Sequence, residues 1–295
     1  MGGMVEPLVG IVGGSGLYEI DGLEEKRWQR VHTPWGPPSD ALLFGRLDGR
    51  RCVFLARHGR GHTLSPTHLN YRANIDALKR AGVTEILSLS AVGSLKEELA
   101  PGQFVLVDQF IDRSFAREKS FFGEGCVAHV SMADPVCARL GNALTEAAAT
   151  IGLPLARGGP YLVMEGPQFS TRAESKLYRS WGCSVIGMTN MPEAKLAREA
   201  ELCYATVAMV TDYDCWRPDH DHVTVEAVVR TLNENVARAQ ALVKAVLPLL
   251  AASRPPCPAG CQNALDSAII TAPPSRNPLL VAKLDAVAGR VLRPS

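Results

Sequence analysis

Two carboxylates follow the most apolar segment of the chain. The run Tyr204–Thr211 leads directly into Asp212, Tyr213 and Asp214. A carboxylate in apolar surroundings is unfavourable unless it meets hydrogen-bond donors, and a ligand can supply them. A carboxyl group with a raised pKa can give a proton to a ring nitrogen of a departing heterocyclic base, and a second can accept a hydrogen bond from an exocyclic amine. The alternative is a helix cap or a surface turn, because two acids in one loop are common.

A glycine-rich turn near the N-terminus is suited to an anion. Gly13, Gly14, Ser15 and Gly16 follow an apolar run. Glycines let successive backbone amides point at a phosphate, and the serine hydroxyl adds a donor. Such a turn is more often a tight connection, so the signal is weak alone. G-x-G-x-x-G and G-x-x-x-x-G-K-[ST] are both absent here, which weakens dinucleotide and nucleoside-triphosphate interpretations.

Two further segments place anion-binding groups after apolar runs. Arg57 and His58 follow Arg51–Leu55, at the strand end where open α/β sheets bind ligands, and the planar guanidinium suits phosphate oxygens. A solvated basic turn is an equally weighted alternative. The segment Ser90–Ser94 offers a hydroxyl, small residues and a glycine, although packing alone could explain it. Three such elements, each after a different predicted strand, argue together for an anion site.

Short β-branched runs alternate with helical periods along the chain. Strands are predicted at Leu8–Val12, Arg51–Leu55, Glu85–Ser90, Gln103–Asp108, Leu162–Glu165, Val185–Met188 and Tyr204–Thr211. Helices are predicted at Tyr71–Ala81, Pro135–Ile151, Glu193–Glu201 and Val225–Leu247. Nearly continuous apolar strands that alternate with helices predict the α/β class, as a single domain with a central, mostly parallel sheet flanked by helices.

Prolines end the last long predicted helix. Pro248 and the prolines between residues 255 and 258 cannot supply the backbone donors that a helix interior needs. Two short helices are predicted at Asn263–Ile270 and Pro278–Leu292, too small for a core of their own, so they should dock on the main domain or on a neighbouring subunit. The predicted organisation is a main domain over residues 1–252, then a linker and helical appendage over residues 253–295.

Composition favours a globular protein that binds small ligands. The 295 residues are 46% hydrophobic and 21% charged, and the formal net charge of +1 gives no basic field for nucleic acid or an anionic membrane surface. Glycines interrupt the apolar stretch in the first twenty residues, and no apolar run reaches the roughly 20 residues of a membrane span. We therefore expect no nucleic-acid partner, no membrane association and a cytoplasmic location.

The eight cysteines show no repeated short spacing. A cytosolic pool would keep them reduced, and most are expected to be small core residues. Cys257 and Cys261 form a C-x3-C pair beside prolines, but two thiols without companion ligands make a weak zinc site. No metal is therefore predicted, and a redox role for this pair is not favoured.

Five motifs, in this order, resemble those of the 5′-methylthioadenosine phosphorylase family. They are GIVGGSG at 10–16, LARHG at 55–59, NYRAN at 70–74, EGPQFS at 165–170 and TDYDCW at 211–216. The resemblance covers roughly residues 8 to 250, within a nucleoside phosphorylase domain over residues 1–252. It implies a homotrimeric α/β glycosyltransferase of purine and methionine salvage that makes adenine and 5-methylthioribose 1-phosphate. Inorganic phosphate would be a co-substrate, with no cofactor.

The resemblance also assigns site residues, position by position. The phosphate site would comprise Ser15, Arg57, His58, Ser90, Ala91 and Thr189. The nucleoside site would comprise Phe169 beside the base, Met188 under the ribose, and Asp212, Tyr213 and Asp214 at the purine edge. Specificity would involve Ser170 and Val225, with Val225 in an apolar pocket for the 5′-substituent that His129 and Met132 of a neighbouring subunit complete. Threonine is frequent in the family where Ser15 and Ser90 stand, and serine keeps the hydroxyl donor.

The implied chemistry needs no covalent enzyme intermediate. Asp212 would be catalytic, sharing or delivering a proton at N7 of the leaving purine, and Asp214 would help place that proton and recognise the 6-amino group. A 6-oxopurine enzyme should instead present an asparagine near the base. The alternatives are a phosphorylase for 6-oxopurine nucleosides, a hydrolase that uses water, and a nonenzymatic nucleoside-binding protein.

Overall fold

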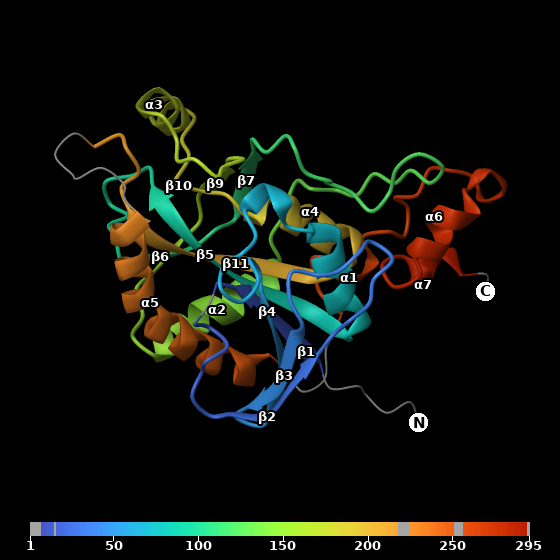
Figure 1. The fold of residues 1–295 in the computed structure, drawn as a ribbon, viewed down its shortest axis with the longest axis horizontal. Helices are drawn as coiled ribbons and strands as arrows, with labels where there is room; N and C mark the ends of the chain where they lie inside the picture. Colours follow the sequence, from blue (N-terminus) through green and yellow to red (C-terminus); the bar gives the residue numbers. More distant parts are fainter. Residues whose placement is uncertain (1–6, 15, 218–224, 251–255, 294–295) are drawn as a thin grey trace.

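A large mixed sheet organises the molecule (Figure 1). The computed structural model describes residues 7–14, 16–217, 225–250 and 256–293. The strands are β1 (Leu8–Gly13), β2 (Leu23–Gln29), β3 (Leu42–Leu47), β4 (Arg50–Ala56), β5 (Val83–Ser94), β6 (Phe104–Leu106), β7 (Gln109–Asp112), β8 (Leu155–Arg157), β9 (Pro160–Val163), β10 (Val185–Gly187) and β11 (Cys203–Asp212). The helices are α1 (Tyr71–Arg80), α2 (Ala138–Thr150), α3 (Arg172–Ser180), α4 (Asn190–Glu199), α5 (Val225–Val246), α6 (Pro278–Lys283) and α7 (Gly289–Leu292).

The sheet runs in the order β2-β3-β4-β1-β5-β10-β9-β7. A branch starts at β5, where β11 pairs with β5, β6 with β11, and β8 with β6. Strand β1 pairs in parallel with β4 and β5, and β5 pairs in parallel with β11. The carboxyl ends of these strands therefore share one edge of the sheet. The predicted α/β class and mostly parallel sheet are confirmed, and each predicted strand has a counterpart in the structure.

Each face of the sheet carries its own core, because successive side chains of a strand point to opposite faces. In β1, Leu8 and Val12 join one cluster with α1 and α4, whereas Val9 and Ile11 join the other with α2 and α5. The two helix pairs thus cover opposite faces, as Figure 1 shows. Helix α3 stands apart at one end and buries only two of its residues, Ser175 and Tyr178.

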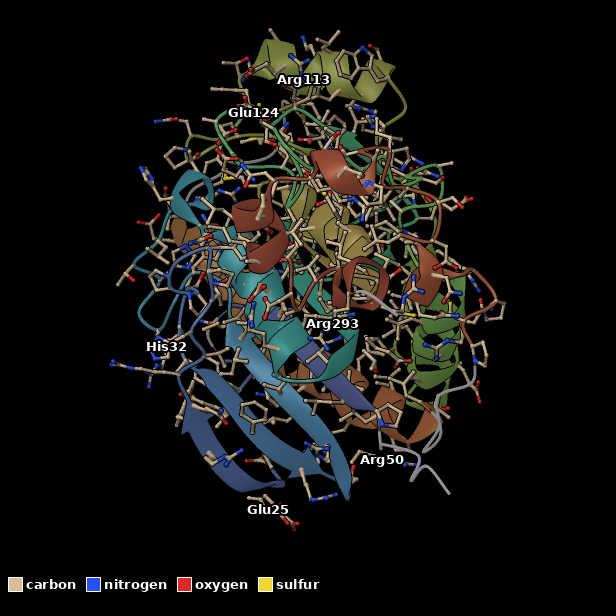
Figure 2. The ribbon with its side chains drawn as sticks, turned by 90° about the vertical axis from the view of Figure 1, so that its right-hand side faces the viewer. Glu25, His32, Arg50, Arg113, Glu124 and Arg293 are labelled. Atoms are coloured by element: carbon tan, nitrogen blue, oxygen red, sulfur yellow. The ribbon has the colours of Figure 1, made fainter. Side chains whose placement is uncertain are left out.

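The C-terminal segment docks on the face that carries α1 and α4. Leu265, Leu284 and Val287 are buried in that core, and Arg80 of α1 pairs with Asp285. Figure 2 looks onto this side, where Glu25 in β2 and Arg50 in β4 lie at the end of the molecule opposite Arg113, which follows β7.

The predicted helix Asn263–Ile270 is wrong. A 3-10 helix at Cys261–Asn263 ends where the predicted helix begins. The residues at the end of the predicted helix pair with another segment instead, because Ile269 forms a bridge with Ala128 and the Ile270 amide donates to the Val127 carbonyl. The predicted helix Pro278–Leu292 is split into α6 and α7. The predicted boundary at residue 252 lies outside the described residues, so the two-part organisation stays a prediction. In the described residues, no helix is both long and apolar enough to cross a membrane.

Candidate active site

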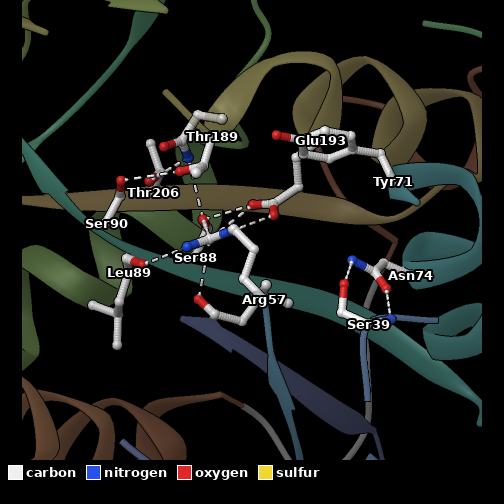
Figure 3. Close-up of polar contacts among 12 residues, drawn as sticks. Ser39, Arg57, Tyr71, Asn74, Ser88, Leu89, Ser90, Thr189, Glu193 and Thr206 are labelled. Atoms are coloured by element: carbon white, nitrogen blue, oxygen red, sulfur yellow. Dashed lines mark hydrogen bonds and ion pairs between the residues drawn. The ribbon is translucent and has the colours of Figure 1, made fainter. Parts of the chain in front are cut away.

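Arg57 lies at the centre of a buried polar network at the carboxyl edge of the sheet (Figure 3). Its Nε and Nη2 donate to the two carboxylate oxygens of Glu193 at 2.7 and 3.1 Å. Nη2 also donates to Ser88 Oγ at 2.7 Å, and Nη1 to the Leu89 carbonyl at 3.0 Å. The side chain is only 2% exposed, so the alternative of a solvated basic turn is wrong for Arg57. The guanidinium is held as a fixed charge with one Nη1 hydrogen left over for a ligand.

Ser90 and Thr189 lie together beside this network. Their hydroxyl oxygens are 3.2 Å apart, and Ser90 Oγ is also 3.1 Å from the Tyr161 hydroxyl. Ser90 belongs to β5, and Thr189 is the residue that precedes α4. Both side chains are buried, at 5% and 6% exposure, so the sheet and the start of α4 hold two hydroxyl donors at one point. Two of the predicted phosphate ligands are therefore brought together.

His58 is half-buried and has a defined tautomer. Its Nδ1 lies 2.8 Å from the Leu64 carbonyl, which can only accept, so Nδ1 carries the proton and Nε2 is left for a ligand. The ring stacks on His62 with centroids 4.2 Å apart. Burial lowers the pKa of His58 to about 4, and the neighbouring Arg57 charge acts in the same direction. His58 is therefore neutral at physiological pH when no anion is bound.

The glycine turn meets Arg57 directly. The Arg57 amide donates to the Gly13 carbonyl at 2.9 Å, which joins the ends of β1 and β4. Ser15 lies outside the described residues, so its predicted contact with phosphate stays a prediction. Ala91 follows Ser90 in β5, and its carbonyl accepts from Ser90 Oγ at 3.4 Å.

The two predicted base-binding acids also lie at this edge, at the end of β11 and just after it. Asp212 Oδ1 accepts from the Asp214 amide and Oδ2 from the Thr211 hydroxyl, both at 2.7 Å. Ser170 Oγ lies 2.8 Å from each carboxylate oxygen of Asp214. Burial is the largest effect on both acids and raises the pKa of each above its ordinary value. Raised pKa values suit carboxyl groups that share or deliver protons.

Gly93 makes room for these acids. It is paired in register with Asp212, and a Cβ at this position would stand 2.9 Å from Asp212 Oδ1 and 3.4 Å from Asp214 Cβ. A side chain on this residue would therefore push the carboxylates away from their positions.

The remaining predicted nucleoside ligands are placed differently. Tyr213 packs in a cluster with Ile186 and Trp216, and its hydroxyl donates to the Glu97 carbonyl at 3.2 Å. Phe169 is 46% exposed and Val225, at the start of α5, is 63% exposed in this single chain. Their predicted contacts with the nucleoside stay predictions, as do those of His129 and Met132.

A second buried ion pair positions the segment of Met188. The Arg117 guanidinium donates to the Met188 carbonyl at 2.6 Å and to Glu165 Oε1 at 3.1 Å. Glu165 also accepts from the Thr67 hydroxyl and from the Phe115 and Ala116 amides, and these bonds hold its pKa at about 2 although burial opposes them. This ion pair holds the backbone beside the predicted ribose position.

Sequence reasoning missed the residues that support Arg57. Glu193, Ser88 and Asn190 are buried around it, and Asn190 Nδ2 donates to Ser88 Oγ at 3.2 Å. A usable signal was present, because an arginine placed at the end of an apolar strand requires a carboxylate partner. The sequence offered no means of choosing Glu193, which is 136 residues away.

Comparison with known proteins shows the family of this chain. The sequence profile described as the Phosphorylase superfamily matches residues 8–248. An S-methyl-5′-thioadenosine phosphorylase of Rhodospirillum rubrum is 66% identical over 288 residues, which cover 97% of this chain and 98% of the relative. The chain belongs to the S-methyl-5′-thioadenosine phosphorylase family. The phosphorylase of the same name from Cereibacter sphaeroides is 63% identical, over 98% of this chain and all of the relative.

Solved structures of methylthioadenosine phosphorylases share the fold. One from an Antarctic soil metagenomic library superposes with a TM-score of 0.90 at 44% identity, over 96% of this chain and 99% of that one. The Schistosoma mansoni enzyme in complex with adenine superposes with a TM-score of 0.78 at 38% identity, over 83% and 92% of the two chains.

Proposed function

We propose that this chain catalyses the phosphorolysis of 5′-methylthioadenosine to adenine and 5-methylthioribose 1-phosphate, as a pentosyltransferase. The observation that carries the proposal is that one edge of the sheet holds both an anion-binding group around Arg57 and a pair of carboxyl groups with raised pKa values. The first group suits phosphate, and the second suits the edge of a purine.

Phosphate would bind where the ends of β1 and β4 and residue Ser90 of β5 lie near the start of α4. The Ser90 and Thr189 hydroxyls donate to its oxygens. Arg57 supplies a positive charge, and its guanidinium group is held in one orientation by Glu193. Neutral His58 presents Nε2 to a protonated phosphate oxygen, or takes up a proton when the dianion binds. Ala91 and Ser15 complete the proposed set.

Cleavage would break the bond between the anomeric carbon and N9 of the base. The electron pair of that bond moves into the purine, while a phosphate oxygen bonds to the anomeric carbon from the opposite face. Asp212 offsets the charge that develops on the base by sharing or delivering a proton at N7. No atom of the protein becomes covalently bonded to the substrate.

Asp214 would select the base. The single Ser170 hydroxyl hydrogen, shared between both oxygens at 2.8 Å, orients the Asp214 carboxylate, so that it can accept from the 6-amino group of adenine. Met188 would lie under the ribose and Phe169 and Tyr213 near the base. Val225 would face the methylthio group. An apolar residue there favours a thioether over a hydroxyl, because a buried hydroxyl needs a partner.

The assembly would be a homotrimer in the cytoplasm. The trimer would cover apolar side chains such as those of Phe115 and Leu279, which are 82% and 78% exposed in the single chain. Analytical ultracentrifugation tests this part, and a monomeric active enzyme would contradict it.

A substrate comparison tests the proposed base preference. At saturating phosphate, kcat/KM should be highest for 5′-methylthioadenosine, lower for adenosine and lowest for inosine. A preference for inosine would overturn the aminopurine assignment of Asp214 and leave phosphorolysis standing.

A further inference from the structure

Four buried cysteines from three separate segments meet at one point. Cys137 is the residue that precedes α2, Cys203 begins β11, and Cys257 and Cys261 come from the segment after α5. Their four Sγ atoms all lie within 4.8 Å of one another, and each residue is at most 3% exposed. The C-x3-C pair therefore has the two companion ligands that its sequence context did not reveal.

The spacing of these sulfur atoms fits a tetrahedral metal ion. Four thiolates at the zinc–sulfur distance of about 2.3 Å would stand roughly 3.8 Å apart. Cys137 and Cys257 have Sγ atoms 3.5 Å apart, and those of Cys257 and Cys261 are 3.7 Å apart. Both separations are far longer than the roughly 2.05 Å of a disulfide bond.

The backbone and the nearby charges support the same assignment. The Gly260 amide donates to the Cys257 carbonyl at 2.8 Å, and Gly260 adopts the left-handed conformation, so the tight turn points both thiols inward. Arg139 Nη2 lies 3.6 Å from Cys203 Sγ, and Arg198 Nη1 lies 3.8 Å from Cys261 Sγ. A divalent ion with four thiolates carries two negative charges, and these guanidinium groups partly offset them.

We propose that Cys137, Cys203, Cys257 and Cys261 bind one structural zinc ion. The donor set is all sulfur and closed, as in structural rather than catalytic zinc sites. The ion would fasten the segment after α5 to β11 and to the start of α2. Zinc would enter during folding, because the four thiols are buried once the chain is folded. Cys257 and Cys261 would bind the ion first, before their segment packs against Cys137 and Cys203.

Metal analysis of the whole chain tests the proposal. The protein is expressed in zinc-containing medium and purified under reducing conditions without chelator. Its zinc content is then measured by inductively coupled plasma mass spectrometry. We expect about one zinc ion per chain, and tetrathiolate charge-transfer and d–d absorption when cobalt replaces zinc. A metal-free chain, with the four thiols either all reactive after anaerobic denaturation or joined as disulfides, would overturn the proposal.

Matched variants locate the site. Cys257→Ser and Cys203→Ser should each lose most of the zinc and unfold at a lower temperature. Cys183→Ser removes a buried thiol from a different cluster and should keep about one zinc ion per chain. Equal zinc in all three variants would contradict the assignment. If a ligand variant does not fold, the zinc content and cobalt spectrum of the unmutated chain decide the question.

Discussion

Arg57 and Glu193 face each other through two parallel hydrogen bonds, from Nε to Oε2 at 2.7 Å and from Nη2 to Oε1 at 3.1 Å. Their side chains are 2% and 4% exposed, and they connect the end of β4 to α4. A two-bond pair fixes the plane of the guanidinium as well as its position. Glu193 thereby fixes the orientation of the Arg57 guanidinium group beside the proposed phosphate site.

Replacing Glu193 by glutamine should weaken both folding and phosphate binding. The substitution leaves the buried Arg57 charge unpaired, which costs about 3–5 kcal/mol of the free energy of unfolding. The guanidinium also loses its fixed direction, so KM for phosphate should rise. Urea denaturation and phosphate-dependent kinetics measure the two effects. The matched control is Glu25→Gln, which breaks the exposed pair with Arg46 and should change stability by less than about 1 kcal/mol. Equal effects of the two variants would contradict this account.

Replacing Asp212 by asparagine should slow turnover more than it weakens phosphate binding. Asparagine has a similar shape but cannot deliver a proton, and general acid catalysis contributes about 10²- to 10⁴-fold. Steady-state kinetics should show a fall in kcat of that order with a nearly constant KM for phosphate. Asp266→Asn, at an exposed position of the C-terminal segment, should retain full turnover. Normal turnover of Asp212→Asn would refute the catalytic assignment.

Anion binding should take up a proton at His58. Burial lowers the pKa of this ring to about 4. A bound dianion favours the imidazolium and raises that pKa, so anion affinity should increase as the pH falls from 7 to 5. Sulfate is the suitable probe because it does not titrate in this range, and calorimetry in two buffers counts the protons. Sulfate binding to His58→Gln should vary less with pH. Equal pH dependence in both proteins would rule out His58 as the source.

Glu199 should make stability depend on pH. Burial raises its pKa from 4.5 to about 7, although the Ser120 hydroxyl and the Phe121 amide donate to it. Between these two values the folded chain keeps a proton that the unfolded chain has lost. Glu199 therefore adds about 3 kcal/mol to the free energy of unfolding when it is protonated in the folded chain. This stabilisation is fully present below pH 4.5 and is lost as the pH rises through 7.

Glu199→Gln removes this titration and can keep both hydrogen bonds. The free energy of unfolding of the unmutated chain should fall relative to Glu199→Gln between pH 5 and pH 8. Glu146→Gln, at an exposed position of α2, should follow the unmutated chain throughout. Parallel curves for the unmutated chain and Glu199→Gln would show that Glu199 does not titrate in this window.

The central strands could be predicted because burial on both faces leaves an apolar run. β1 and β11 are examples, since nearly every residue is buried. β2 could not be predicted, because six of its seven residues are exposed and several are charged. It forms because it pairs with β3, and the residues of β2 alone carry no sign of that pairing. The same limit explains the wrong helix at Asn263–Ile270, where pairing with residues 127 and 128 overrides an apolar period compatible with a helix.

The site was predictable where short motifs carry it. Arg57 follows the end of β4 and Asp212 ends β11, so their shared edge follows from parallel topology. Ser90 was expected at a strand end, but β5 continues past it to Ser94. Contacts across long separations were not predictable. The Glu193 carboxylate and the two cysteines that join Cys257 and Cys261 come from distant segments, and only the folded chain brings them together.

Phosphate dependence is the most direct test of the proposed reaction. Purified protein is mixed with 5′-methylthioadenosine, with and without inorganic phosphate, and adenine and the sugar phosphate are quantified by chromatography and phosphorus NMR. We predict that adenine appears only with phosphate, in equal amount to 5-methylthioribose 1-phosphate. Adenine release at the same rate without phosphate, or tight binding of the nucleoside with no product, would contradict the account.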